Sequence, residues 1–190
     1  MTRSFLFMLL VIPFSCWAHN THDQPSIING ILHPFTGWDH MFALLAIGWI
    51  TFQHKGFLNS CAIPLTFILG LLFGATLGTN EIAPKGIEFG IATSLMVFGA
   101  LIAFKVPTKN MWPLILGAGI FHGFAHGAEM PANSSALMYF SGFTVSSAIL
   151  LSLGFKAHQH FSNSIAIQKI RKMVAGVLLF VGTLLLLGLT

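Results

Sequence analysis

Residues 111–129 read MWPLILGAGIFHGFAHGAE. This stretch decides the fold class, because about 20 predominantly apolar residues are what a helix needs to cross the hydrocarbon core of a bilayer. It contains no Lys or Arg, and its one carboxylate stands at its end. The stretch therefore predicts a membrane-spanning helix, and its two histidines would lie within the membrane.

The composition of the whole chain agrees with a membrane protein. Of 190 residues, 55% are hydrophobic and 7% are charged, whereas a soluble domain carries about 25% charged residues. An ordinary soluble enzyme and a disordered tail are both excluded. The formal charge of +4 does not indicate a nucleic-acid partner, because the nine Lys and Arg are scattered between apolar runs and do not form a basic face.

Six apolar runs have the length of a membrane span. They lie near residues 33–52, 61–79, 86–104, 111–129, 135–153 and 171–189. The connectors are short, and only residues 156–172 are numerous enough to hold structure of their own. We therefore predict an all-α integral membrane protein, a bundle of six transmembrane helices in one domain over residues 19–190.

The first 18 residues have the layout of a cleaved signal peptide. A basic residue, Arg3, precedes a short apolar stretch, and small residues stand before the predicted cleavage site after Ala18. The alternative is an uncleaved first anchor. Cleavage would leave Cys61 as the only cysteine, so no disulfide can form within the mature chain.

Basic residues predict the orientation. With the mature N-terminus outside, the inner connectors hold seven of them and the outer connectors only Lys85, and positive charge favours the cytoplasmic side. The seven are Lys55, Lys105, Lys109, Lys156, Lys169, Arg171 and Lys172. We expect a multi-pass protein of a bacterial cytoplasmic (inner) membrane, with the lipid bilayer as its surroundings.

Two sets of glycines recur at every fourth position. They are Gly70, Gly74 and Gly78 in one run and Gly119, Gly123 and Gly127 in another. Small residues at this spacing let helix backbones approach closely in lipid. The pattern predicts tight helix packing, within the chain or between copies in a homo-oligomer.

Ionisable residues gather at two places within the predicted spans. The first group is His33, Asp39 and His40, and the second is His122, His126 and Glu129. An Asp near the centre of a span costs about 2.5 to 3.5 kcal/mol, so such residues usually serve a function. His122 and His126 are one helical turn apart and Glu129 follows three residues later, so the three share a face.

The two groups are predicted to lie at matched depths. The first span enters the membrane from outside and the fourth leaves toward the outside, so the rise per residue puts His40 beside His122 and His33 beside Glu129. Pro34 suits a first helical position, with His33 at the mouth of that helix. A lone buried histidine is often a packing residue. Four histidines with two carboxylates and no thiolate suit Zn²⁺, Ni²⁺, Co²⁺ or Fe²⁺ better.

His19 is a further candidate ligand. At the mature N-terminus it would offer an amine and an imidazole together, and the alternative is a mobile polar end.

At these residues the chain resembles the HupE/UreJ family of nickel and cobalt permeases. The family signatures are His-x5-Asp-His in the first mature span and Phe-His-Gly-x-Ala/Val-His-Gly-x-Glu in the fourth. Both are complete here, as His33 to His40 and as Phe121 to Glu129. The resemblance implies uptake of Ni²⁺, with Co²⁺ as an alternative, for metalloenzymes such as hydrogenase or urease.

Two hypotheses follow for the function. The first is a secondary permease for a divalent ion, Ni²⁺ before Co²⁺ or Zn²⁺, with no catalytic residue and no cofactor beyond the ion itself. The alternative is an intramembrane metal-dependent hydrolase, in which Asp39 or Glu129 would act as the base. A metal sensor or a delivery partner for another complex is a third, weaker reading.

Overall fold

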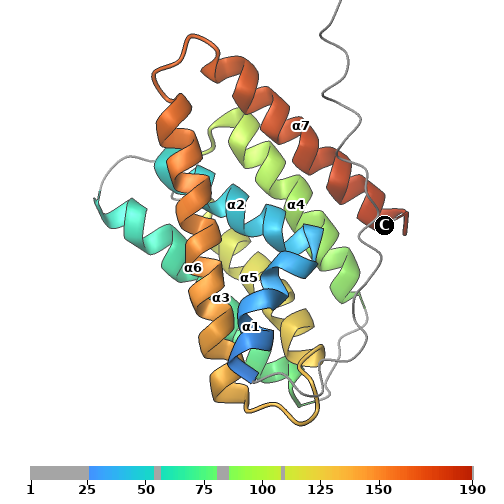
Figure 1. Cartoon of the computed structure of the whole chain (residues 1–190). Coiled ribbons are helices and arrows are strands. Elements are labelled where there is room, and N and C mark those ends of the chain that lie inside the picture. The colour runs from blue at the N-terminus through green and yellow to red at the C-terminus, as the bar shows by residue number, and fades with distance from the viewer. Residues whose placement is uncertain (1–25, 54–56, 81–85, 108–109, 190) are drawn as a thin grey trace, which may run out of the picture.

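The structure, a computed structural model, describes residues 26–53, 57–80, 86–107 and 110–189. Within these ranges the chain forms seven helices and no strands (Figure 1). The helices are α1 (Ser26–Thr36), α2 (Trp38–Gln53), α3 (Phe57–Gly78), α4 (Ile87–Phe104), α5 (Trp112–Ala128), α6 (Ala136–Phe161) and α7 (Ile167–Leu186). The predicted signal peptide, residues 1–18, and His19 lie outside the described residues.

Three of the described helices are long and apolar enough to cross a membrane. They are Ser60–Gly78 within α3, all of α4 and all of α6. On α3, Leu65, Leu69 and Phe73 follow one another at every fourth position, and each is more than half exposed. Such an outward apolar stripe suits contact with lipid. The all-α membrane class is therefore confirmed, whereas the count of six spans and the cleaved leader stay predictions.

The first predicted span differs from the expectation. It begins earlier, at Ser26, and is broken at Gly37 into α1 and α2. Pro34 stands in the last turn of α1 and not at a helix start, so that prediction was wrong. The apolar residues before it already form a helix, and the missing proline N–H removes a bond to the carbonyl of Gly30, which favours an end soon afterwards. His33 is therefore on a different helix from His40.

The connector between the last two predicted spans is also shorter than expected. α6 continues to Phe161 and α7 begins at Ile167, so most of residues 156–172 is helical. No Gly or Pro interrupts this stretch, and both helices extend past the predicted span ends.

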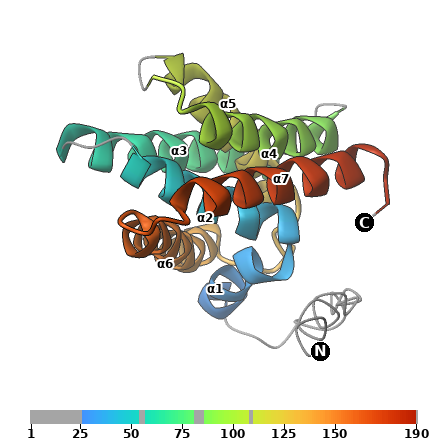
Figure 2. The same ribbon diagram turned by 90° about the horizontal axis from the view of Figure 1, so that it is seen from above.

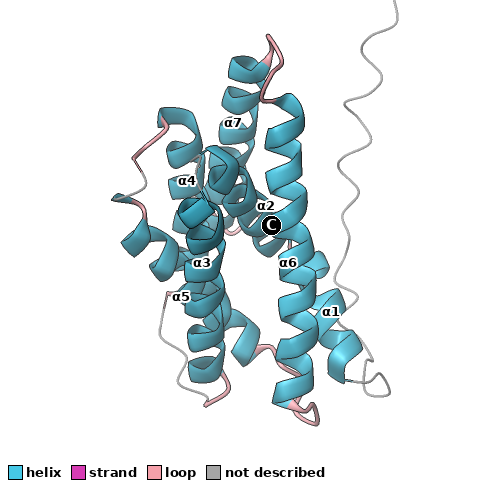
Figure 3. Ribbon diagram, turned by 90° about the vertical axis from the view of Figure 1, so that its left-hand side faces the viewer, coloured by secondary structure: helices cyan, strands magenta, loops and turns pink. Residues whose placement is uncertain are grey.

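Glycines bring the helices together in pairs. α3 and α5 lie side by side (Figure 3), and both glycine sets noted above lie in their contact. A Cβ on Gly74 would overlap the Ile120 carbonyl, and one on Gly123 would overlap the Leu71 carbonyl. The predicted close packing is thus seen within one chain, and association between copies stays a prediction.

Glycines also allow α6 to pack closely against α1 and α2. Gly30 and Gly142 each face a backbone carbonyl across α1 and α6, and Gly48 and Gly154 do so across α2 and α6. As a result α2 lies at the centre of the bundle, in contact with α1, α3, α4, α6 and α7 (Figure 2). Nine of its residues, from His40 to Thr51, are buried. The ionisable residues at its N-terminal end are therefore held inside protein.

Candidate metal centre

Helix α5 supplies three of the candidate ligands. Pro113 lies in its first turn, where a missing N–H does no harm, and the helix then runs without a break to Ala128. His122 and His126 project from one face and are each 1% exposed. Glu129 caps the helix, and its N–H donates to the Ala125 carbonyl at 2.9 Å. Its side chain is 55% exposed, so the row of ligands runs from the surface to the interior.

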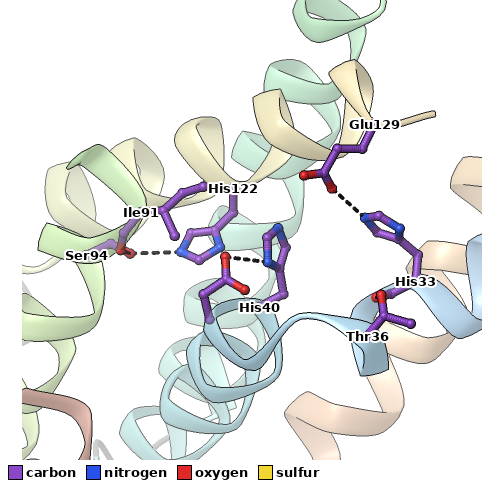
Figure 4. A network of polar contacts seen from close by, with 8 residues as sticks. His33, Thr36, His40, Ile91, Ser94, His122 and Glu129 are labelled. Carbon is purple, nitrogen blue, oxygen red and sulfur yellow. Dashed lines mark hydrogen bonds and ion pairs between the residues drawn. The ribbon is translucent and has the colours of Figure 1, made fainter. Parts of the chain in front are cut away.

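The break at Gly37 lets α1 and α2 supply the other three candidates. Nε2 of His33, in the last turn of α1, lies 3.1 Å from Oε2 of Glu129. Nδ1 of His40, in the first turns of α2, lies 2.7 Å from Oδ2 of Asp39. Figure 4 shows the His33–Glu129 pair on one side of the centre and the ring of His40 beside that of His122 on the other.

The four imidazole rings form one continuous row. The ring centroids of His33 and His126 are 4.7 Å apart, those of His126 and His40 are 3.9 Å apart, and those of His40 and His122 are 5.1 Å apart. The structure therefore brings together six of the seven residues singled out in the sequence. The seventh, His19, lies outside the described residues.

The row divides into two groups that could each hold a metal ion. His33, His126 and Glu129 each offer a ligand atom within 4.8 Å of the other two, and so do Asp39, His40 and His122. We call these the outer group and the inner group. Their composition follows the depth argument, since each combines residues from the first predicted span with residues from the fourth.

Several ring nitrogens of the centre are buried and have no partner within the described structure. They are Nε2 of His40, Nδ1 of His122 and Nδ1 of His126. A buried polar atom without a partner costs about 1–3 kcal/mol, so three on adjacent rings need an explanation. An imidazole nitrogen with a free lone pair is a good ligand for Zn²⁺, Ni²⁺ or Co²⁺. The donor set thus fits a divalent transition metal.

Asp39 orients His40 through its contact with Nδ1. In a neutral ring whose Nδ1–H donates to the carboxylate, Nε2 of His40 keeps a lone pair that points away from Asp39. A carboxylate behind a metal-binding histidine commonly fixes the tautomer in this way. Asp39 can therefore serve the centre either as a ligand or as a support for His40.

Residues outside the two sequence motifs also contact the centre. Oγ of Ser94 on α4 lies 2.8 Å from Nε2 of His122. From α6, the ring of Phe143 lies 4.1 Å from that of His126, and the ring of Tyr139 lies 5.7 Å from that of His33. A serine or an aromatic residue in an apolar run is common in any span, so nothing in the sequence marked these contacts.

The model of a family described as "HupE / UreJ protein" matches residues 7–185. The chain belongs to the HupE/UreJ family. It is also 32% identical over 182 residues to "Protein HupE" of Rhizobium leguminosarum bv. viciae, a match that covers 94% of each chain. No solved structure matches the chain.

Membership in the HupE/UreJ family agrees with the apolar helices. Both support a membrane protein, and the family is associated with metal transport. The resemblance noted from the two histidine motifs is confirmed, and it extends over nearly the whole chain.

Proposed function

We propose that the chain is a membrane permease that takes up Ni²⁺ through the outer and inner groups of the metal centre. Co²⁺ is the alternative cargo, with Zn²⁺ after it, and the ion is substrate and not a resident cofactor. One observation carries the proposal above all. Three buried ring nitrogens, on His40, His122 and His126, lack partners at the meeting point of α2 and α5, in a chain of this family.

The donor set favours such a cargo. Imidazole with carboxylate suits Ni²⁺, Co²⁺ and Zn²⁺, whereas Mg²⁺ and Ca²⁺ prefer oxygen ligands and Cu⁺ prefers sulfur. The centre contains four imidazoles and two carboxylates, and the one cysteine of the described residues, Cys61, is an exposed residue of α3 and not among them.

The gradient of exposure suggests the order of events. Glu129 is the most exposed member and carries the charge that would attract a cation to the outer group. His126 adjoins both His33 and His40, so an ion can exchange ligands step by step between the groups. The inner group is almost completely buried, and there the ligands must replace the water that the ion has lost. We propose that one ion at a time uses the two groups, because two divalent ions so close would repel each other.

The membrane potential can drive this uptake. Moving one charge across 100 mV is worth about 2.3 kcal/mol, so a divalent ion moving to a negative inside gains about 4.6 kcal/mol. For this the outer group must face the outside of the cell. The orientation predicted for the chain in a bacterial inner membrane places it there. No Walker-type loop is present in the sequence, which agrees with transport that does not hydrolyse a nucleotide.

The hydrolase alternative would need a cavity for a substrate beside the ligands. Two grooves stand out in the described structure, one between α2, α3 and α6 and one between α2, α6 and α7, and both are lined by other residues. We favour transport because the chain belongs to the HupE/UreJ family, which is associated with metal uptake.

Metal binding by the purified protein tests the proposal. The full chain in lipid nanodiscs is titrated with Ni²⁺, Co²⁺ and Zn²⁺ by calorimetry, alongside His126→Ala and His160→Ala. His160 is exposed near the end of α6, where its ring contacts Phe161, and serves as the matched control. Removing a group that supports a metal ligand costs roughly 10- to 100-fold in affinity. We expect His126→Ala, which removes a ligand itself, to lose at least that much affinity for Ni²⁺. His160→Ala should bind like the wild type. Undiminished binding by His126→Ala would overturn the proposed site.

A further inference from the structure

Ser94 approaches the metal centre from a helix that carries none of the candidate ligands. It lies in α4 and is 6% exposed. Its Oγ is 2.8 Å from Nε2 of His122, a residue 28 positions later in the chain. Figure 4 shows the ring of His122 between Ser94 on one side and His40 on the other.

Only one assignment of the protons makes both contacts of Ser94 hydrogen bonds. Its Oγ also lies 2.7 Å from the carbonyl oxygen of Ile91. A carbonyl can only accept, and a hydroxyl has a single proton to give, so Ser94 donates to Ile91. Toward His122 the same oxygen must then accept, and Nε2 of His122 carries the hydrogen.

This assignment fixes the other nitrogen of the ring. A neutral imidazole carries one N–H, and its second nitrogen has a lone pair. With the hydrogen on Nε2, the lone pair of His122 is on Nδ1. Nδ1 is the atom that is buried without a partner, and His122 belongs to the inner group with Asp39 and His40.

We propose that Ser94 is a positioning residue of the inner group. By accepting the Nε2 hydrogen it holds His122 in the Nε2–H tautomer and directs Nδ1 toward the ion. Asp39 has the corresponding role for His40, with the two nitrogens exchanged. It accepts the Nδ1 hydrogen and leaves Nε2 free. The inner group thus binds the ion through Nδ1 of His122 and Nε2 of His40. This inference rests on the proposed transport function.

The packing of α4 explains why Ser94 reaches His122. Gly90, one helical turn before Ser94, lies against the ring of Phe121, and a Cβ at Gly90 would overlap that ring. The glycine therefore lets α4 approach α5 closely next to His122. The close approach puts the Ser94 hydroxyl at hydrogen-bonding distance from the ring of His122.

Nitrogen NMR of the protein labelled with ¹⁵N-histidine reads the tautomer directly. We expect Nδ1 of His122 to be unprotonated in the metal-free wild type, and its resonance to shift when Zn²⁺ is added as a diamagnetic probe. In Ser94→Ala the Nε2–H has lost its acceptor, so the Nδ1–H form should become populated. A wild type in which His122 carries its hydrogen on Nδ1 would overturn the proposal.

Affinity measurements separate positioning from packing. Supporting groups of this kind are worth about 10- to 100-fold in metal affinity, so Ser94→Ala should bind Ni²⁺ that much more weakly. Ser94→Thr keeps the hydroxyl and should recover most of the loss. Ser146→Ala is the matched control, because Ser146 is buried as well but its hydroxyl bonds to carbonyls of its own helix.

The possible results distinguish the two proposals. If the wild type binds no Ni²⁺, the transport proposal fails, and the NMR spectrum still decides the tautomer that Ser94 imposes. If the wild type binds Ni²⁺ and Ser94→Ala binds it equally well, the role of Ser94 is refuted and the permease is not.

Discussion

Replacing Gly123 with alanine should damage both the fold and the metal centre. The new Cβ would lie 2.6 Å from the carbonyl carbon of Leu71 and 2.8 Å from its Cα. Carbon atoms in contact prefer at least about 3.5 Å, so relieving these two contacts alone would move α5 away from α3 by about 0.9 Å. The Leu71 carbonyl oxygen lies nearer still, so the full movement would be larger. Both partners are backbone, and no side chain can turn aside. Overpacking of this kind costs about 1–3 kcal/mol of stability.

The same movement would displace the ligands. His122 precedes Gly123 directly and His126 follows one turn later, so a movement of α5 would disturb the 2.8 Å contact between Nε2 of His122 and Oγ of Ser94. Metal sites must be held to within about 0.5 Å. We therefore expect Ni²⁺ affinity to fall on the order of 10- to 100-fold, as when a supporting group is lost.

Gly117→Ala is the control for this substitution. It lies on the same helix, and a Cβ there would meet nothing within 4 Å, so alanine should be neutral or stabilising by up to about 1 kcal/mol. Thermal unfolding and Ni²⁺ titration in nanodiscs compare the two variants. If Gly123→Ala unfolds at the same temperature as Gly117→Ala and binds Ni²⁺ equally well, the close contact of α3 and α5 does not hold the centre in place.

Further predictions concern the outer group, the leader and the orientation. In a calorimetric double-mutant cycle, His33→Ala and Glu129→Gln should each weaken Ni²⁺ binding. The loss of binding free energy in the double variant should be smaller than the sum of the two single losses, because both residues act on one group. Full additivity would contradict a shared site. The intact mass of the purified protein should correspond to a chain that starts at His19, whereas a retained leader would favour the uncleaved anchor. In a background without the two native cysteines, an impermeant maleimide should label Asn133→Cys but not Asn163→Cys in intact cells. The reverse pattern would contradict the predicted orientation.

The meeting of the two histidine groups could be predicted because a helix has a fixed rise. Once the first and fourth spans were assigned opposite directions, 1.5 Å per residue matched His40 with His122 and His33 with Glu129. The structure shows those neighbours, at a centroid distance of 5.1 Å and an atomic distance of 3.1 Å. The glycine repeats likewise predicted close packing, because the absence of a side chain lets two helix backbones approach each other wherever helices meet.

The break at Gly37 could not be predicted from the same reasoning. Whether a helix continues through Pro34 depends on what its preceding turns pack against. Here the α1 turn around Gly30 packs on Gly142 of α6, a contact between residues more than a hundred positions apart.

The role of Ser94 was equally beyond the sequence. A serine within a span usually bonds to a carbonyl of its own helix, and Ser94 does so with Ile91. Only the position of α4 against α5 shows that its oxygen also accepts from His122.

The metal content of whole cells tests the central claim most directly. Cells expressing the wild type, His126→Ala, His160→Ala or an empty vector, at matched membrane levels, are compared for Ni, Co, Zn, Fe, Mn and Cu by mass spectrometry. We predict that Ni rises with the wild type and with His160→Ala, and stays at the vector level with His126→Ala. If no metal rises in cells whose protein is inserted and binds Ni²⁺ after purification, the chain is not a permease for that ion.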